Sequence, residues 1–298
     1  MTKLRKALLV LLPVLGVVTL ALAGCKPETK SGGGAQATKP AGSGAAAGGG
    51  TPKPAGGGGT LEVKAYNATL KGRIVYNGDE EPKIEEKPTN KPSSECPATV
   101  LGAGWYTKDS SDKKGIKYAV VFIRPVGGRL PKVPETVAKP AVDIVEMRQP
   151  KCQFEPRVLV MGPGQKLKFY NDSDPKISHD ANLSGPTSIN KTLPPGETVI
   201  YDPDADNSQP YKVICNQHSG FMSGWVWRFD HPWAAVTDAD GKFEIKNVPV
   251  LSSGKLAVVI WHELLPGDNR MQFAEIELKD GEVKDLGTIG IPKPTKAS

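Results

Sequence analysis

The chain has 298 residues, with 38 Lys and Arg against 32 Asp and Glu, so its formal net charge at pH 7 is +6. The excess lies in residues 1–60, which hold seven basic residues and one acid, while the rest of the chain holds 31 of each. A nucleic-acid-binding domain needs a basic patch of its own, so this charge distribution gives no support for a nucleic-acid partner.

The first residues are typical of an export signal. Three basic residues precede an apolar run over residues 7–23, which is also long enough to span a membrane. The run ends in Leu22-Ala23-Gly24-Cys25, which resembles the lipobox of bacterial lipoproteins. This resemblance implies a signal peptide over residues 1–24 and a lipidated Cys25. The protein would then lie in the cell envelope facing the periplasm, and Lys26 after the cysteine favours the outer membrane.

The next segment has an unusual composition. Residues 25–60 consist mainly of Gly, Ala, Pro, Thr and Lys and contain almost no large apolar side chain. Such a segment cannot bury enough apolar surface to offset the entropy lost on folding. We expect a disordered tether.

From residue 61 onward, short segments rich in β-branched and aromatic residues are separated by Gly, Pro, Asn and Asp turns. This pattern predicts an all-β fold of sandwich type, as one large domain or two small ones. The predicted strands are Gly72–Tyr76, Tyr118–Ile123, Val158–Met161, Lys166–Tyr170, Thr198–Tyr201, Tyr211–Cys215, Trp225–Phe229, Lys242–Ile245, Ala257–Trp261 and Phe273–Leu278. We expect no helix longer than one or two turns, and we expect loops over Asp79–Ser94 and Val126–Pro140.

The segment over residues 224–229 carries apolar side chains on both faces, since alternate residues of a strand point to opposite sides. We expect this strand to be covered on both sides. The alternative is an aromatic patch exposed to a partner.

One short loop holds a thiol, an imidazole and a thioether, in Cys215, His218 and Met222. A cysteine and two histidines in a trigonal array with a weak axial methionine form the ligand set of blue-copper electron-transfer sites. The second imidazole has to come from elsewhere. His179 is the candidate, because it follows the predicted strand Lys166–Tyr170 and a sheet can bring it beside the loop.

Other chemistries fit the loop less well. Zinc could use His179, Cys215 and His218, but a thioether is a poor zinc ligand and no good fourth ligand is evident. A c-type haem needs Cys-x2-Cys-His, which the sequence lacks, and a binuclear copper centre needs a second cysteine in the loop. The settings of His231, in a Pro-bounded turn, and His262, at the end of a predicted strand, favour structural roles.

Together these motifs resemble the cupredoxins of plastocyanin type. Four further motifs extend the likeness to bacterial plastocyanin-like lipoproteins, in which a cupredoxin accompanies a carboxypeptidase-regulatory-like, transthyretin-like sandwich. The likeness runs from about Leu70 to about Pro266, and the four motifs are Cys152–Pro156, Asp230–Trp233, Ala235–Phe243 and Trp261–Glu263.

The resemblance implies an all-β architecture with two sandwiches. A Greek-key cupredoxin sandwich over residues 141–230 would be inserted between two parts of the transthyretin-like sandwich, residues 61–140 and 231–298.

The resemblance also implies one mononuclear type 1 copper ion bound by His179, Cys215, His218 and Met222. Cys215 would set the electronic coupling, His218 would be the ligand at the solvent edge, and Met222 would tune the potential. The chain has Asp180 where many cupredoxins have an Asn that ties the two ligand loops together. That difference leaves the rigidity and the potential of the site open.

Each of the four cysteines then has an expected role, with Cys25 assigned to lipid and Cys215 to metal. The resemblance places a cysteine in each of the regions of Cys96 and Cys152 and so implies a disulfide between them, which export permits. The alternative is two unpaired buried thiols.

We therefore expect a blue copper protein that acts as a membrane-anchored electron carrier for a redox protein such as a c-type cytochrome or a terminal oxidase. We expect no enzymatic activity, because copper nitrite reductases and multicopper oxidases need more histidines than His231 and His262 supply, and no nucleophile elbow is apparent. The alternative is a surface-anchored binding or copper-handling module with a structural or stored metal.

Overall fold

The computed structural model describes residues 58–78, 82, 84–104, 106–185 and 187–291. The predicted signal peptide, the lipidation site Cys25 and nearly all of the predicted tether lie outside these residues. No helix in the described part of the chain is both long and apolar enough to cross a membrane.

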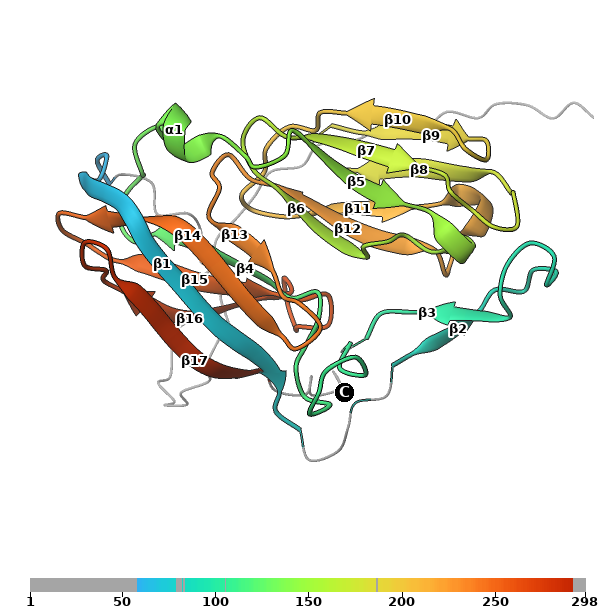
Figure 1. Cartoon of the computed structure of the whole chain (residues 1–298), viewed down its shortest axis with the longest axis horizontal. Helices are drawn as coiled ribbons and strands as arrows, with labels where there is room; N and C mark the ends of the chain where they lie inside the picture. The colour runs from blue at the N-terminus through green and yellow to red at the C-terminus, as the bar shows by residue number, and fades with distance from the viewer. Residues whose placement is uncertain (1–57, 79–81, 83, 105, 186, 292–298) are drawn as a thin grey trace, which may run out of the picture. The chain divides into compact units, whose positions relative to one another are not determined.

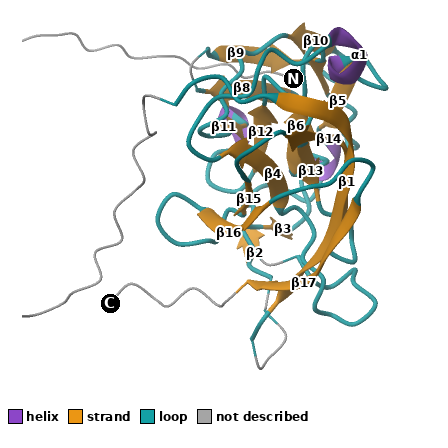
Figure 2. Ribbon diagram, turned by 90° about the vertical axis from the view of Figure 1, so that its left-hand side faces the viewer, coloured by secondary structure: helices purple, strands orange, loops and turns teal. Residues whose placement is uncertain are grey.

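The described residues form an all-β structure, as predicted, and belong to one compact unit (Figures 1 and 2). Its strands are β1 Val63–Tyr76, β2 Glu86–Pro88, β3 Thr99–Leu101, β4 Val120–Pro125, β5 Ile144–Arg148, β6 Val158–Met161, β7 Lys166–Tyr170, β8 His179–Ser184, β9 Ile189–Leu193, β10 Thr198–Tyr201, β11 Tyr211–Ile214, β12 Ser223–Arg228, β13 Ala234–Val236, β14 Lys242–Leu251, β15 Leu256–Trp261, β16 Arg270–Ile276 and β17 Val283–Ile291. The short helical turns are α1 Glu135–Ala138, η1 Pro150–Cys152 and η2 Asn216–His218.

The strands β5 to β12 pair only with one another. They form a five-stranded sheet in the order β6-β12-β11-β8-β9 and a three-stranded sheet in the order β10-β7-β5 (Figure 1). Apolar side chains of both sheets share one core, which includes Met147 on β5, Phe169 on β7, Leu183 on β8 and Val213 on β11. We call this pair of sheets the central sandwich.

Strands β2 and β3 pair only with each other, whereas the other strands on either side of this segment pair across it. They form a four-stranded sheet in the order β13-β4-β15-β16 and a three-stranded sheet in the order β14-β1-β17. Their shared core includes Leu70 and Ile74 on β1, Val121 on β4, Phe243 on β14 and Val258 on β15. We call this pair of sheets the flanking sandwich.

A third cluster joins residues of the two sandwiches. It contains Phe122 on β4 and Trp261 on β15, together with Val158 on β6 and Trp227 on β12. Val226, the neighbour of Trp227, packs into the core of the central sandwich. Strand β12 is thus covered on both faces, as its sequence predicted.

Several elements differ from the sequence prediction. β1 is 14 residues long, because its first half pairs with β14 in positions that its mixed polar sequence did not reveal. The strand β2 lies in the predicted loop Asp79–Ser94, and α1 lies in the predicted loop Val126–Pro140. The polar strands β8 and β9 were also missed. Pairing of β8 with β11 and of β9 with β8, rather than local propensity, places them in the sheet.

Candidate metal centre

Three neighbouring elements of the central sandwich position the predicted ligands. His179 is the first residue of β8, while Cys215 directly follows β11 and caps the turn η2, whose last residue is His218. β8 and β11 are antiparallel, with Asn182 opposite Ile214, so the start of one strand lies beside the end of the other. The sheet register therefore brings His179 to the cysteine loop.

The three donor atoms converge on one point. Cys215 Sγ lies 3.4 Å from His218 Nδ1 and 3.8 Å from His179 Nδ1, and the two Nδ1 atoms are 3.0 Å apart. Around a metal with bonds of about 2.0 Å to nitrogen and 2.3 Å to sulfur, such atoms would be separated by roughly 3.5 Å. The cluster fits a single metal ion, and all three side chains are buried.

The cysteine loop is closed by its own backbone. Cys215 N–H donates to the Met222 carbonyl at 3.2 Å, and Met222 N–H donates to the His218 carbonyl at 3.1 Å. Gly220 has φ of +91°, which lets the chain turn between the two ligands. Met222 is buried in the same core cluster as Cys215, at the position from which β12 starts.

Asp180 holds the two ligand segments together. Its backbone N–H donates to Cys215 Sγ at 3.2 Å, and its carboxylate accepts hydrogen bonds from Thr192 Oγ1 at 2.7 Å and Gln217 Nε2 at 3.1 Å. The Gln149 side chain donates to the Asp180 carbonyl at 2.9 Å. Asp180 therefore contacts the cysteine loop through both Cys215 and Gln217. Sequence reasoning missed the three partner side chains, because none lies in a recognisable motif.

Burial sets the protonation of the donors. It lowers the pKa of His179 to about 4, with a smaller contribution from His218, and it also lowers the pKa of His218. Both rings are therefore neutral at pH 7 and can offer a nitrogen lone pair. Burial raises the pKa of the Cys215 thiol, so metal binding would have to displace its proton.

The Cys96–Cys152 pair forms a disulfide and lies beside this cluster. The two sulfur atoms and a ring nitrogen of His218 lie within 4.8 Å of one another. His218 itself is only 3% exposed. The predicted disulfide is therefore present, whereas the expectation that His218 lies at the solvent edge is wrong, because its side chain is buried with the disulfide beside it.

The other two histidines lie elsewhere in the fold. His231 stacks between Phe229 and Trp233, with ring centroids 5.1 and 5.4 Å away, and its Nδ1 accepts the Trp233 backbone N–H. His262 is buried, and its Nδ1 accepts the Leu264 backbone N–H. These contacts support packing roles.

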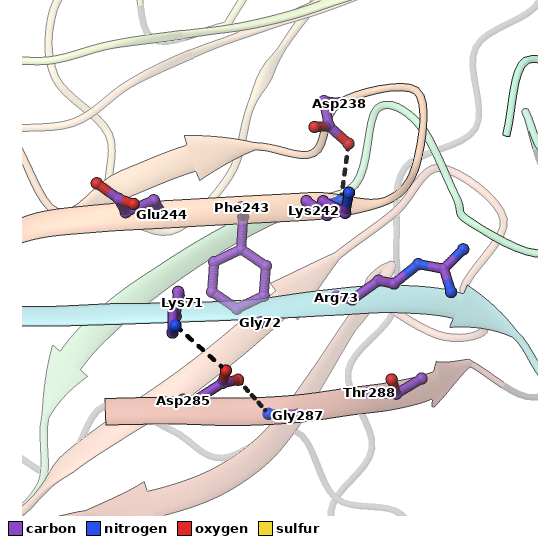
Figure 3. Close-up of a pocket in the computed structure, with 10 residues that line it drawn as sticks. All are labelled: Lys71, Gly72, Arg73, Asp238, Lys242, Phe243, Glu244, Asp285, Gly287 and Thr288. Atoms are coloured by element: carbon purple, nitrogen blue, oxygen red, sulfur yellow. Dashed lines mark hydrogen bonds and ion pairs between the residues drawn. The ribbon is translucent and has the colours of Figure 1, made fainter. Parts of the chain in front are cut away.

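A groove of about 560 Å³ lies on the sheet β14-β1-β17, away from the histidine–cysteine cluster (Figure 3). Phe243 lies over Gly72 at its centre, and Lys71 pairs with Asp285 at 3.5 Å. Asp285 also accepts the Gly287 backbone N–H. Basic and acidic side chains line the groove in equal number, so the groove is a weaker candidate site than the buried cluster.

No protein-family model matches the chain, and no curated protein is similar to it at a significant level.

Proposed function

We propose that the protein is a mononuclear type 1 copper electron carrier, in which His179, Cys215, His218 and Met222 would hold the metal. The observation that carries this proposal is the convergence of one thiol and two neutral imidazoles in a buried cluster. Thiolate and imidazole together are the donors that select copper for electron transfer, and a methionine beside them favours copper over zinc.

Bound copper supplies a one-electron couple between Cu(II) and Cu(I). The protein's part is to hold the donors in place and to keep water away. Burial of the cluster excludes solvent, and the Asp180 N–H donates to the sulfur. The backbone bonds within the cysteine loop limit its movement. Ligands that move little on oxidation or reduction keep the barrier to electron transfer low.

The strand pairing supports a division into a cupredoxin domain and a transthyretin-like domain. The strands within residues 141–230 pair only with one another. Strands β1 and β4 of residues 61–140 share sheets with strands of residues 231–298, while β2 and β3 pair only with each other. We propose that Cys25 anchors this assembly to the envelope by lipid. Its redox partner would be a c-type cytochrome or a terminal oxidase.

Adding Cu(II) to the protein tests this function. We expect an intense thiolate-to-copper band in the visible region and a reversible one-electron wave in voltammetry. Cys215→Ser should abolish the band, and Met222→Leu should shift the potential. Met147→Leu is the matched control, because Met147 is equally buried in the same core without belonging to the cysteine loop. Copper binding without the visible band, or copper that cannot be cycled, would favour a copper-handling module instead.

A further inference from the structure

His218 belongs to two groups of side chains whose atoms could bind a metal. One is the cluster with His179 and Cys215, and the other consists of His218 with Cys96 and Cys152. The ligand atoms of each group lie within 4.8 Å of one another. The second group contains two sulfur atoms and one imidazole nitrogen, all from buried residues, and the proposed electron carrier makes no use of its sulfurs.

The backbone places both cysteines at this ring from separate segments. Cys96 lies in the connection between β2 and β3, where its N–H donates to the Pro92 carbonyl at 3.1 Å. Cys152 ends the turn η1 in the left-handed region, with φ of +59°, a conformation that non-glycine residues seldom adopt. Both cysteines pack in the same core cluster as Cys215 and Met222. Two segments are therefore held with their sulfurs beside the imidazole.

We propose that reduction of the Cys96–Cys152 disulfide creates a Cu(I)-binding site formed by the two thiolates and His218. Thiolates are soft donors that select Cu(I), and the imidazole supplies a third ligand. Around a metal with sulfur bonds of about 2.3 Å, the two sulfurs would sit roughly 4 Å apart, so the sulfurs that are bonded to each other in the disulfide have to move apart after reduction. The site goes beyond the proposed electron transfer, because its two thiolates are independent of Cys215.

Formation of this site takes a reduction step and a binding step. A dithiol reductant gives two electrons and two protons to the disulfide and becomes a disulfide itself, which leaves Cys96 and Cys152 as thiols. Binding of Cu(I) then displaces the two thiol protons, and the oxidation state of the copper does not change. Because His218 is common to both groups, copper bound there lies beside the ligands Cys215 and His179. The reduced pair is thus placed to receive Cu(I) and pass it to the main centre.

A Cu(I) titration of the full-length protein tests the site. The protein is reduced anaerobically with dithiothreitol and freed of the reductant by gel filtration. Cu(I) is then added in competition with bicinchoninate. A neutral imidazole has one lone pair, so His218 can serve only one of the two centres at a time, and the comparison is made in Cys215→Ser. We expect the reduced form of that variant to bind one more equivalent of Cu(I) than its oxidised form. The Cys96→Ser/Cys152→Ser variant, treated in the same way, should show no such gain.

The variant Cys215→Ser separates this proposal from the electron-carrier function. It should lose the main centre and still gain one equivalent on reduction, and X-ray absorption of that copper should show two sulfur neighbours and one nitrogen. If the main centre binds no copper at all, the gain of one equivalent on reduction is still expected.

Three results would overturn the proposal. One is equal Cu(I) binding by the reduced and oxidised forms of Cys215→Ser, and another is a gain that persists in the double cysteine variant. The third is loss of the near-ultraviolet circular dichroism of the tryptophans on reduction, because the site requires the folded arrangement around His218.

Discussion

Arg157→Met removes one side of a buried ion pair that joins the two sandwiches. Arg157 Nε and Nη2 lie 2.7 and 2.9 Å from the carboxylate oxygens of Glu263, and the exposed fractions of the two side chains are 10% and 6%. Trp225 Nε1 is the other donor to this carboxylate, at 3.1 Å. The variant leaves the Glu263 carboxylate buried, with the Trp225 indole N–H still donating to it. Removing one partner of a buried pair costs about 3–5 kcal/mol, so we expect the free energy of unfolding to fall by that amount at pH 7.

The pH dependence of this loss follows from Glu263. Burial raises the pKa of its carboxyl, but the bonds from Arg157 outweigh burial and hold the pKa below its ordinary value. In the wild type, the ionised carboxylate therefore stabilises the fold above the ordinary pKa, and this contribution is lost as the pH falls through the lower folded pKa. Without Arg157, burial raises the pKa and the neutral acid is favoured. The difference between wild type and variant should therefore be largest near neutral pH and shrink toward pH 4.

Urea unfolding followed by tryptophan fluorescence measures both effects. Lys71→Met is the control, because Lys71 and Asp285 are 3.5 Å apart with exposed fractions of 47% and 58%, and exposed pairs contribute less than about 1 kcal/mol. A loss for Arg157→Met no greater than that of the control at pH 7, or a loss that does not change with pH, would refute this reasoning.

Three further predictions concern the metal centre and its surroundings. Asp180→Asn removes a buried negative charge beside Cys215, so voltammetry should find a higher copper potential; an unchanged or lower one would contradict the assigned role. Burial lowers the pKa of His262 to about 4, so as the pH falls the unfolded chain takes up this proton before the folded chain does. The free energy of unfolding, measured with urea, should therefore be steady above about pH 6.5, and this ring should lower it by roughly 3 kcal/mol toward pH 4. A flat profile across that range would argue against a buried neutral ring. Cys96→Ser/Cys152→Ser removes a cross-link between residues 56 apart, so the free energy of unfolding of the variant, measured in urea, should be about 4 kcal/mol lower. Equal urea midpoints for wild type and variant would show that the disulfide does not constrain the unfolded chain.

The donors of the candidate site could be found from the sequence because their chemistry is local. Cys215, His218 and Met222 occupy eight consecutive residues, a spacing that a single loop can fold around one ion. His179 was harder to place, and it was found because the chain has only four histidines and this one follows a strand. The structure adds the register of β8 on β11, which no local pattern specifies.

The supporting contacts could not be predicted in the same way. Arg157 and Glu263 are 106 residues apart, and their pairing depends on how two sandwiches pack. The hydrogen bonds of Asp180 to Thr192 and Gln217 likewise depend on tertiary pairing of polar residues that have no periodic signature. Apolar alternation predicts strands with one buried face, so the polar strand β8 was overlooked.

The packing of β12 gives the flanking sandwich a physical role at the proposed metal centre. This strand starts at Ser223, directly after Met222, and the Ser223 carbonyl accepts a hydrogen bond from Arg157 Nη1 at 3.1 Å. Val226 packs in the core that contains Cys215, and Trp227 packs in the cluster shared with β4 and β15. Moving the Met222 end of the cysteine loop would therefore disturb contacts in both sandwiches. A carrier that gains and loses one electron benefits from such restraint, because ligands fixed from both sides rearrange little between the two oxidation states.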